Sequence, residues 1–426
     1  MRVTSLKKKL AVIGAGAGGL AVLQVFSKHL EIFELTCFEQ SDKVGGTWNY
    51  TEKVGLNDLG RPLHSSMYRN MKTNLPKEVM AFQDYPFPPH LSSFLRHSDV
   101  ASYLSDYAEF HQLKKYIKFH SFVKSVGKED DGRIKIVWEV GKSGDEEDIF
   151  DYLVICNGHY TTPYTPDLRG LENFKGDVIH SHNYRKPDQY KARSVLVLGA
   201  GPSGVDIADD IASVTENTVL LSHRKPNFNP KMRPNISLVS EMTEIIGSNR
   251  VQLANGDTYE VDSIVFCTGY RYNFPFLEEN VKLRITNERL YPLYKHLVDA
   301  RNPNIIYLGI TKTVLPFPHF HIQASFAAAV FTNQITLPCE DDMLADIEND
   351  YKWRTEELGF SEKRAHYLHQ LQWAYNDDLC ELASIPRLPS SVSNLYLGVH
   401  QARTQDLQHY KEKNYRIVDE HTFVEV

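Results

Sequence analysis

One short stretch near the N-terminus constrains the fold of this chain more than any other. An apolar run at residues 10–13 leads directly into Gly14-x-Gly16-x-x-Gly19, and a segment with helical spacing of apolar residues follows. In such a strand–turn–helix unit the glycines allow a tight turn, close approach to a phosphate, and close packing of helix on strand. The helix N-terminus then favours an anion. The stretch predicts a dinucleotide site, although a glycine-rich turn without a ligand has the same pattern.

The same pattern occurs again 185 residues later, as G-x-G-x-x-G at residues 199–204 after a strand-like run at 194–198. Twenty residues past the last glycine, the first copy has Glu39, whereas the second has Arg224 followed by Lys225. An acid there accepts a ribose 2′-hydroxyl and repels a phosphate, whereas a base accommodates a 2′-phosphate. The pair predicts FAD or NAD in the first site and NADP in the second, unless the basic pair is there by chance.

Composition fits a globular chain with more than one core. It has 426 residues, 42% of them hydrophobic and 24% charged, with a net charge of −7. This mild acidity, with no basic tract beyond residues 7–9, argues against nucleic acid as a partner. The five cysteines are far apart in sequence, which favours a reducing compartment and argues against metal or dithiol chemistry. No secretory leader or membrane-length apolar segment is visible, so we expect a cytoplasmic protein without a membrane anchor.

The order of elements predicts an α/β fold with two Rossmann-like dinucleotide-binding domains, the second inserted into the first. Residues 153–158 and 263–269 are each a buried strand ending in glycine, where a nucleotide unit closes. We expect residues 1–160 to begin the FAD domain, 161–290 to form the NADPH domain with its linkers, and 291–426 to complete the FAD domain with C-terminal helices. Within this plan, residues 160–190 are expected to be an extended linker.

Few other residues offer catalytic groups. His319 and His321 are two positions apart, unlike metal-binding histidines four apart on a helix, so we expect them in a loop or pocket wall. Asn74 lies in a loop-like stretch, and its amide offers a donor and an acceptor to a heterocycle, although a turn or cap is the commoner role. Two dinucleotides without other catalytic groups imply that NADPH reduces FAD, which passes electrons to dioxygen or another acceptor.

These motifs together resemble those of the flavin-containing monooxygenases, which are class B flavoprotein monooxygenases. The family hallmark is present as F-x-G-x-x-x-H-x-x-x-Y-R at residues 174–185. Further similar motifs are Gly-Gly-Thr-Trp at 45–48, Thr-Asn-Leu-Pro-Lys at 73–77, Gly-Pro-Ser-Gly at 201–204 and Phe-Cys-Thr-Gly-Tyr at 266–270. The resemblance covers nearly the whole chain and is strongest to shorter soluble insect enzymes, including those that N-oxygenate pyrrolizidine alkaloids.

The resemblance implies an NADPH- and O₂-dependent oxygenation of a small tertiary amine, such as an alkaloid, or of a sulfide. It implies that NADP⁺ stays bound while reduced flavin and O₂ form a C4a-hydroperoxide, whose distal oxygen the substrate attacks. The site must keep water away, and the prolines and aromatic residues of 316–320 are expected in its wall. The hallmark residues 180–184 are expected to couple the domains. The sequence leaves open whether the protein forms a homo-oligomer.

The resemblance also implies roles for individual residues. Asn74 is the residue expected to act in catalysis, by holding the oxygenated flavin. Gln323 is expected at the isoalloxazine, and Ser203, Ser222 and Arg224 at NADPH. The full expected cofactor-binding set is Gly14, Gly16, Gly18, Gly19, Glu39, Gln40, Gly46, Thr47, Trp48, Thr73, Asn74, Val123, Gly199, Gly201, Pro202, Ser203, Gly204, Ser222, Arg224, Lys225 and Gln323.

Other functions share parts of this pattern. A flavin disulfide reductase has the same two-dinucleotide plan but needs a close cysteine pair. A nucleotide-binding sensor would not need the hallmark together with Asn74 and both glycine patterns. A Baeyer–Villiger monooxygenase or an NADPH oxidase of the same fold remains the main alternative, although a Baeyer–Villiger enzyme would be expected to have Trp in place of Tyr184.

Overall fold

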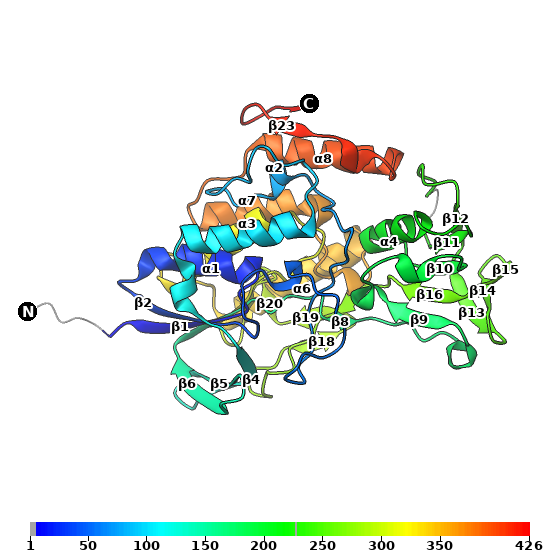
Figure 1. Ribbon diagram of the computed structural model, residues 1–426. Coiled ribbons are helices and arrows are strands. Elements are labelled where there is room, and N and C mark those ends of the chain that lie inside the picture. Colours follow the sequence, from blue (N-terminus) through cyan, green and yellow to red (C-terminus); the bar gives the residue numbers. More distant parts are fainter. Residues whose placement is uncertain (1–5, 226–227) are drawn as a thin grey trace, which may run out of the picture.

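The computed structural model describes residues 6–225 and 228–426, which form two α/β units joined by a C-terminal segment (Figure 1). The first unit is built on a seven-stranded sheet in the order β20-β21-β22-β7-β1-β2-β3. Its parallel strands are β1 (Lys8–Ile13), β2 (Phe33–Phe38), β3 (Ile117–Lys118), β7 (Tyr152–Ile155) and β22 (Ile305–Tyr307), and its antiparallel edge is β21 (Val298–Asp299) and β20 (Leu293–Tyr294).

Side chains of β1 alternate between two cores, because successive residues of a strand point to opposite faces. Leu10 and Val12 pack under the helices, whereas Ala11 and Ile13 face a small antiparallel sheet. The helices of the first face are α1 (Ala17–Phe26), α3 (His97–Phe110) and α5 (Pro316–Phe331), and the small sheet is β4 (Ser121–Lys128), β5 (Ile134–Val140) and β6 (Asp145–Phe150). Both faces of the parallel sheet are therefore covered.

The second unit repeats this plan with a smaller sheet. Its five parallel strands have the order β12-β11-β10-β16-β9, with α4 (Pro202–Ala212) on one face and a three-stranded antiparallel sheet on the other. The strands are β9 (Asp177–His180), β10 (Val195–Leu198), β11 (Val219–Ser222), β12 (Ile236–Val239) and β16 (Ser263–Phe266), with β13 (Met242–Ile246), β14 (Arg250–Leu253) and β15 (Thr258–Glu260) in the small sheet. The predicted pair of Rossmann-like domains is confirmed.

The second unit is inserted between β7 and the last strands of the first sheet. The outgoing chain at β8 (Thr162–Pro163) pairs antiparallel with the returning chain at β17 (Tyr270–Arg271), so the two connections lie side by side. The linker expected over residues 160–190 is partly wrong, because β9 pairs with β16 as an edge strand of the second sheet. Its half-exposed residues lack the apolar run that marks a central strand. Domain boundaries near residues 160 and 290 stay predictions.

A loop, one of the two places expected for His319 and His321, is wrong, since both residues lie on helix α5. Pro316 and Pro318 fall in the first turn, where backbone N–H groups have no acceptor within the helix. His319 is fully buried there and does not line a loop, because its two ring nitrogens contact Thr311 Oγ1 and Asn376 Oδ1, both at 2.7 Å. His321 lies half-buried on the same helix.

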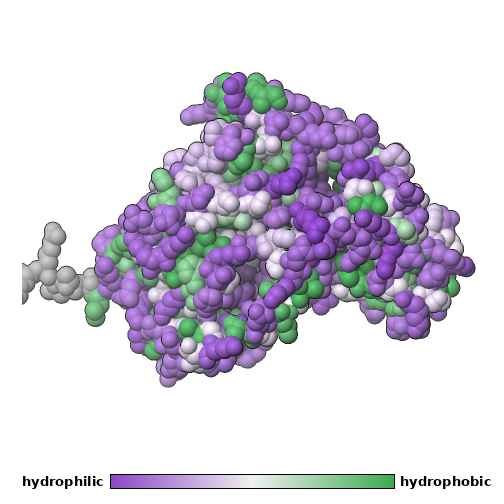
Figure 2. Space-filling view, in the orientation of Figure 1, coloured by the Kyte–Doolittle hydropathy of each residue, from purple (hydrophilic) through white to green (hydrophobic). Residues whose placement is uncertain are grey.

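The remaining elements support the first unit and close the chain. Helix α8 extends across the top of the molecule toward the second unit (Figure 1). These elements are α2 (Lys77–Met80), β18 (Arg284–Thr286), β19 (Arg289–Tyr291), α6 (Glu340–Lys352), α7 (Gln372–Leu382), α8 (Ser390–Gln405), β23 (Tyr415–Ile417) and β24 (Phe423–Glu425). On the face shown in Figure 2, hydrophobic residues form scattered small areas among hydrophilic ones. No helix within 6–225 or 228–426 has the length and apolarity of a membrane span.

The third glycine of each pattern brings its helix against the preceding turn. A Cβ atom on Gly19 would lie 1.8 Å from the carbonyl oxygen of Gly14, and one on Gly204 would lie 1.7 Å from that of Gly199. The first glycines have φ of 97° and 109°, in the left-handed region that favours glycine. The two patterns thus make equal turns.

We expect Gly204→Ala to destabilise the protein by about 3 kcal/mol or more, because the added Cβ overlaps backbone that cannot move alone. Gly201→Ala is the matched control. Its Cβ would meet no atom of the described residues within 4 Å, so a loss below about 1 kcal/mol is expected. Urea unfolding of both variants measures the difference, and equal stabilities would contradict the packing argument.

Candidate active site

The two helices that follow the glycine turns begin with open N-termini. Gly16 precedes α1 and Gly201 precedes α4, neither helix has a side-chain cap, and neither has an acidic residue in its first turn. Their first N–H groups are therefore free to bind phosphate oxygens. The space beside Gly201 is open, and the nearest atom to a Cβ on Gly16 would be Gly46 Cα at 3.6 Å. This geometry fits the pyrophosphate of a dinucleotide at both turns.

A buried carboxylate lies beside the first turn. Glu39 Oε2 accepts a hydrogen bond from Ala15 N–H at 2.8 Å, and Oε1 accepts from the Ser41 N–H and hydroxyl at 2.9 and 2.7 Å. Glu39 is 6% exposed, so its carboxylate group is held in one position at the turn. A phosphate group is disfavoured at this place. Gln40 follows it and is half-buried.

Residues 45–48, three of which are expected to bind a cofactor, pack on the first turn. Gly45 N–H donates to Ala15 O at 3.0 Å, which places residues 45–48 on the glycine turn. Within them, Thr47 Oγ1 lies 3.1 Å from Ser66 Oγ, and the Trp48 ring meets Phe317 of α5 edge-on at 6.4 Å. Gly18 is also at the turn, where a Cβ would lie 2.9 Å from a Leu308 methyl group.

Three predicted site residues have side chains that are engaged inside the protein. Gln323 is fully buried, with Oε1 accepting from Gly309 N–H and Nε2 donating to Tyr375 Oη, both at 3.0 Å. The Ser222 hydroxyl donates to Ser240 O and accepts from Met242 N–H. Val123 is part of β4 and packs in the core between the small sheet and the parallel sheet. The structure gives all three a role in the fold, and their cofactor contacts stay predictions.

At the second turn the structure separates the two basic residues. Lys225 Nζ donates to Ala200 O at 2.5 Å, directly on the glycine turn. The Arg224 side chain is 78% exposed and its guanidinium lies 2.7 Å from Glu241 Oε1. Burial, and then the positive charge of Arg403 on α8, lower the pKa of Lys225. The charges of Lys225 and Arg403 thus lie near each other, and Arg403 had not been expected. Pro202 and Ser203 are exposed in the first turn of α4.

Known proteins share this arrangement. The family model described as flavin-binding monooxygenase-like matches residues 7–229 and 228–398. The chain belongs to this family. It is therefore a flavoprotein monooxygenase that uses FAD and NADPH, as expected from the two glycine turns.

Three relatives of this monooxygenase span almost its whole length. Flavin-containing monooxygenase FMO GS-OX3 of Arabidopsis thaliana is 35% identical, over 88% of this chain and 85% of the plant protein. Trimethylamine monooxygenase of Methylocella silvestris is 31% identical, over 96% and 92%. The solved structure of S-allyl-L-cysteine S-oxygenase from Allium sativum has a TM-score of 0.89 at 31% identity, over 97% and 96%. Cyclohexanone monooxygenase, 14% identical with a TM-score of 0.63, shares the fold alone.

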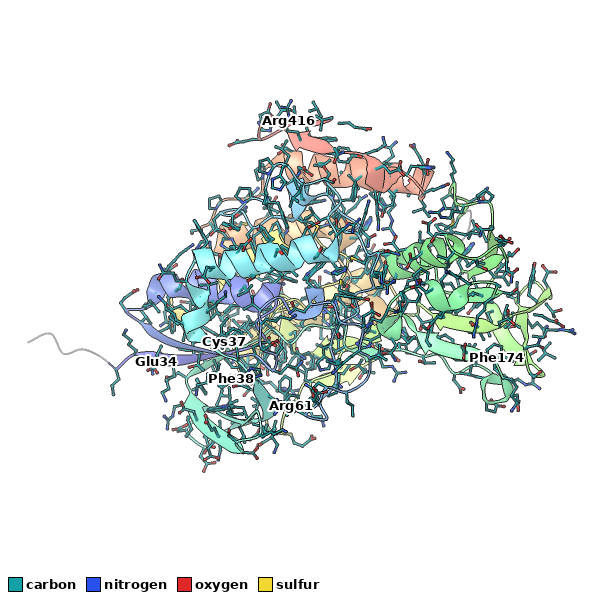
Figure 3. The ribbon with its side chains drawn as sticks, viewed as in Figure 1. Glu34, Cys37, Phe38, Arg61, Phe174 and Arg416 are labelled. Carbon is teal, nitrogen blue, oxygen red and sulfur yellow. The ribbon has the colours of Figure 1, made fainter. Side chains whose placement is uncertain are left out.

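The family hallmark joins the two units. Phe174 packs in the core of the second unit, far from Cys37 and Phe38 on β2 (Figure 3). Tyr184 Oη donates to Asp210 Oδ2 on α4 at 2.7 Å, and the buried Arg185 guanidinium donates to backbone carbonyls of the first unit, including Ser65 O at 3.1 Å. Tyr184 and Arg185 thus link α4 and the first unit through adjacent residues, and the coupling role expected of residues 180–184 stays a prediction.

A further contact comes from Tyr410, a residue that the sequence did not single out. Tyr410 Oη donates to Asn74 Oδ1 at 3.2 Å, across 336 positions of sequence. Next to Asn74, Thr73 is buried and its hydroxyl accepts from Leu95 N–H at 3.0 Å. Among residues 6–225 and 228–426, no three His, Cys, Asp or Glu side chains converge as a metal site.

Burial keeps the hallmark histidine neutral. Desolvation lowers the pKa of His180 to about 4, although its hydrogen bond to Gly269 O opposes the shift. Its Nδ1 accepts from His182 N–H at 3.1 Å, so the remaining proton is on the Nε2 that faces this carbonyl. Both ring nitrogens therefore have hydrogen-bonding partners only when the imidazole is neutral.

We expect acid to destabilise the enzyme partly through this histidine. Between pH 6.5 and 4 the unfolded chain binds a proton that the folded His180 does not. Each pH unit of acidification in this range therefore lowers the free energy of unfolding by about 1.4 kcal/mol. The contribution of His180 to stability is fully present above pH 6.5. Denaturant unfolding from pH 7 to 4.5 measures the slope, which His180→Asn should reduce by about one proton. An unchanged slope would show that His180 does not titrate on unfolding.

Proposed function

We propose that this enzyme uses NADPH and O₂ to oxygenate soft nucleophilic sulfur or nitrogen in small molecules. The observation that carries the proposal is the charge difference between two otherwise equal turns. A buried carboxylate, Glu39, stands at the first, and cationic groups led by Lys225 stand at the second. One chain thus has separate places for FAD and for a 2′-phosphorylated nucleotide.

The first turn, with Gly14, Gly16, Gly46 and Glu39, would hold FAD, and the second would hold NADPH. When bound, FAD supplies the transfer of electrons from NADPH to dioxygen that side chains cannot perform. The remaining predicted cofactor residues would contact these two nucleotides. The protein's own task is to position the two nucleotides and to exclude water.

The start of α5 supports a water-excluding wall beside the first turn. Phe317 stacks on Phe82 at 5.2 Å and on Tyr103 at 6.1 Å, and it meets Trp48 edge-on. Trp48 follows the segment that packs on the Gly14–Gly19 turn. The rings are largely apolar, and the Tyr103 hydroxyl is already bonded to Phe82 N–H and Tyr85 O. The group therefore offers water few hydrogen-bonding partners, which suits a reactive oxygen species.

Sulfur and nitrogen both stay within the proposed substrate class. The relatives named above are an S-oxygenase and a trimethylamine monooxygenase at equal identity to this chain. The pyrrolizidine alkaloid suggested by the resemblance to insect enzymes stays a prediction. We also propose a cytoplasmic location, supported by five cysteines that are all unpaired.

The test supplies the FAD-loaded protein with NADPH, ¹⁸O₂ and either trimethylamine or a thioether such as S-allyl-L-cysteine. We expect N-oxide or S-oxide carrying one ¹⁸O, detected by mass spectrometry. Asn74→Asp should abolish the product and keep FAD bound, because a carboxylate cannot donate the hydrogen bonds of the amide. NADPH consumption that yields only hydrogen peroxide would identify an NADPH oxidase. Ester formation from a cyclic ketone, without amine or sulfide oxidation, would identify a Baeyer–Villiger enzyme.

The basic residues at the second turn should select NADPH over NADH. Each charge-assisted contact to a 2′-phosphate contributes about 1.5–3 kcal/mol, so Lys225→Ala is expected to raise KM for NADPH by about tenfold or more. KM for NADH, which has no such phosphate, should change less than threefold. Arg224→Ala tests the more exposed cation in the same way. Equal effects on both nucleotides would remove the residue from the phosphate site.

A further inference from the structure

The C-terminal segment after α8 returns to the loop that contains Asn74. Tyr410 Oη donates to Asn74 Oδ1 at 3.2 Å, and the next residue, Lys411, donates through Nζ to Lys72 O at 3.1 Å. Tyr410 and Lys411 thus both hold residues 72–74. Tyr410 bonds the side chain of Asn74, and Lys411 bonds the backbone carbonyl of Lys72. Neither contact follows from the glycine turns or from the hallmark.

The hydrogen bond from Tyr410 fixes which way the Asn74 amide faces. An asparagine amide has an oxygen that accepts and a nitrogen that donates, and the two are exchanged by a 180° rotation. With Oδ1 taken by the tyrosine hydroxyl, Nδ2 and its two hydrogens are directed to the other side. Desolvation raises the pKa of Tyr410, so the hydroxyl remains a donor at every working pH.

Burial makes this contact rigid. Tyr410 is 2% exposed, and its ring meets Phe94 edge-on at 5.4 Å. Phe94 precedes Leu95, whose N–H donates to the Thr73 hydroxyl beside Asn74. The tyrosine and the asparagine loop therefore both contact the segment at residues 94–95, and the hydroxyl has little freedom to leave the amide.

Lys411 connects the same stretch to the second unit. Its ammonium lies 2.5 Å from Asp206 Oδ2 on α4, four residues after Pro202 at the start of that helix. The two side chains are 16% and 14% exposed, and Tyr68 Oη also donates to Asp206 at 3.1 Å. Losing either partner would leave an uncompensated charge, so the pair fixes α4 relative to residues 72–74.

We infer that Tyr410 is a positioning residue that orients the Asn74 amide toward the cofactors, and that Lys411 ties this orientation to the helix that begins the NADP turn. The inference rests on the proposed function for the role of Asn74. It assigns the C-terminal segment to the active site, although none of its residues need touch a reacting atom. When α4 is displaced, the segment that orients Asn74 is displaced with it.

The test compares Tyr410→Phe, which removes only the hydroxyl, with Tyr415→Phe, which removes a hydroxyl from another ring packed on Phe94 at 6.4 Å. The dissociation constant of NADP⁺ on the oxidised holoenzyme is measured by flavin difference spectroscopy. Hydrogen peroxide released per NADPH is measured separately. We expect Tyr410→Phe to weaken NADP⁺ binding about fivefold, the size of one neutral hydrogen bond, and to increase peroxide release. Tyr415→Phe should match the wild type in both.

A mutant cycle separates positioning from mere stability. In an Asn74→Ala background, Tyr410→Phe should leave NADP⁺ affinity unchanged, because the amide that it orients is gone. In the protein that retains Asn74, Lys411→Met should weaken NADP⁺ binding. Unchanged NADP⁺ affinity in Tyr410→Phe, or a lower unfolding temperature as its only effect, would overturn the inference. If the wild type oxygenates neither substrate, the proposed function fails, yet the NADP⁺ measurements still decide the role of Tyr410.

Discussion

The contact between each helix and its glycine turn is the constraint on which the rest depends. At Gly19 and Gly204 the helix approaches the turn so closely that no side chain fits. This approach fixes the starts of α1 and α4 at the carboxyl ends of the parallel strands that precede them. Their free N–H groups then face the region where the two nucleotides are needed.

Similar backbones become different sites through charge. The Glu39 carboxylate is held by Ala15 and Ser41, so the first turn keeps a fixed negative charge. Lys225 donates a hydrogen bond to the second turn and lies near Arg403 of α8, a helix far away in the sequence. Under the proposed function, the two turns select different nucleotides, FAD at the first and NADPH at the second. The protein thereby supplies selection and geometry, and the cofactors supply the bond-making chemistry.

Directional polar contacts hold the two units together. Asp206 and Asp210 on α4 accept from Tyr68, Lys411, Asn70 and Tyr184, which come from both sides of the junction. Buried hydrogen bonds of this kind specify one arrangement, because a shifted interface would leave charged groups without partners. The placement of α4 and the orientation of Asn74 therefore belong to one network.

The sequence by itself determined the features that depend on neighbouring residues. Apolar spacing and the two glycine patterns predicted the paired α/β units, and the residues at positions 39, 224 and 225 predicted their different nucleotides. The sequence favoured Arg224 over Lys225, however, and it missed β9 and the helix at Pro316. Only the tertiary structure decided that Lys225 lies on the turn and that Tyr410 meets Asn74. The reason is physical: strand and helix periodicity act over a few residues, whereas these contacts join segments brought together only by the packed cores.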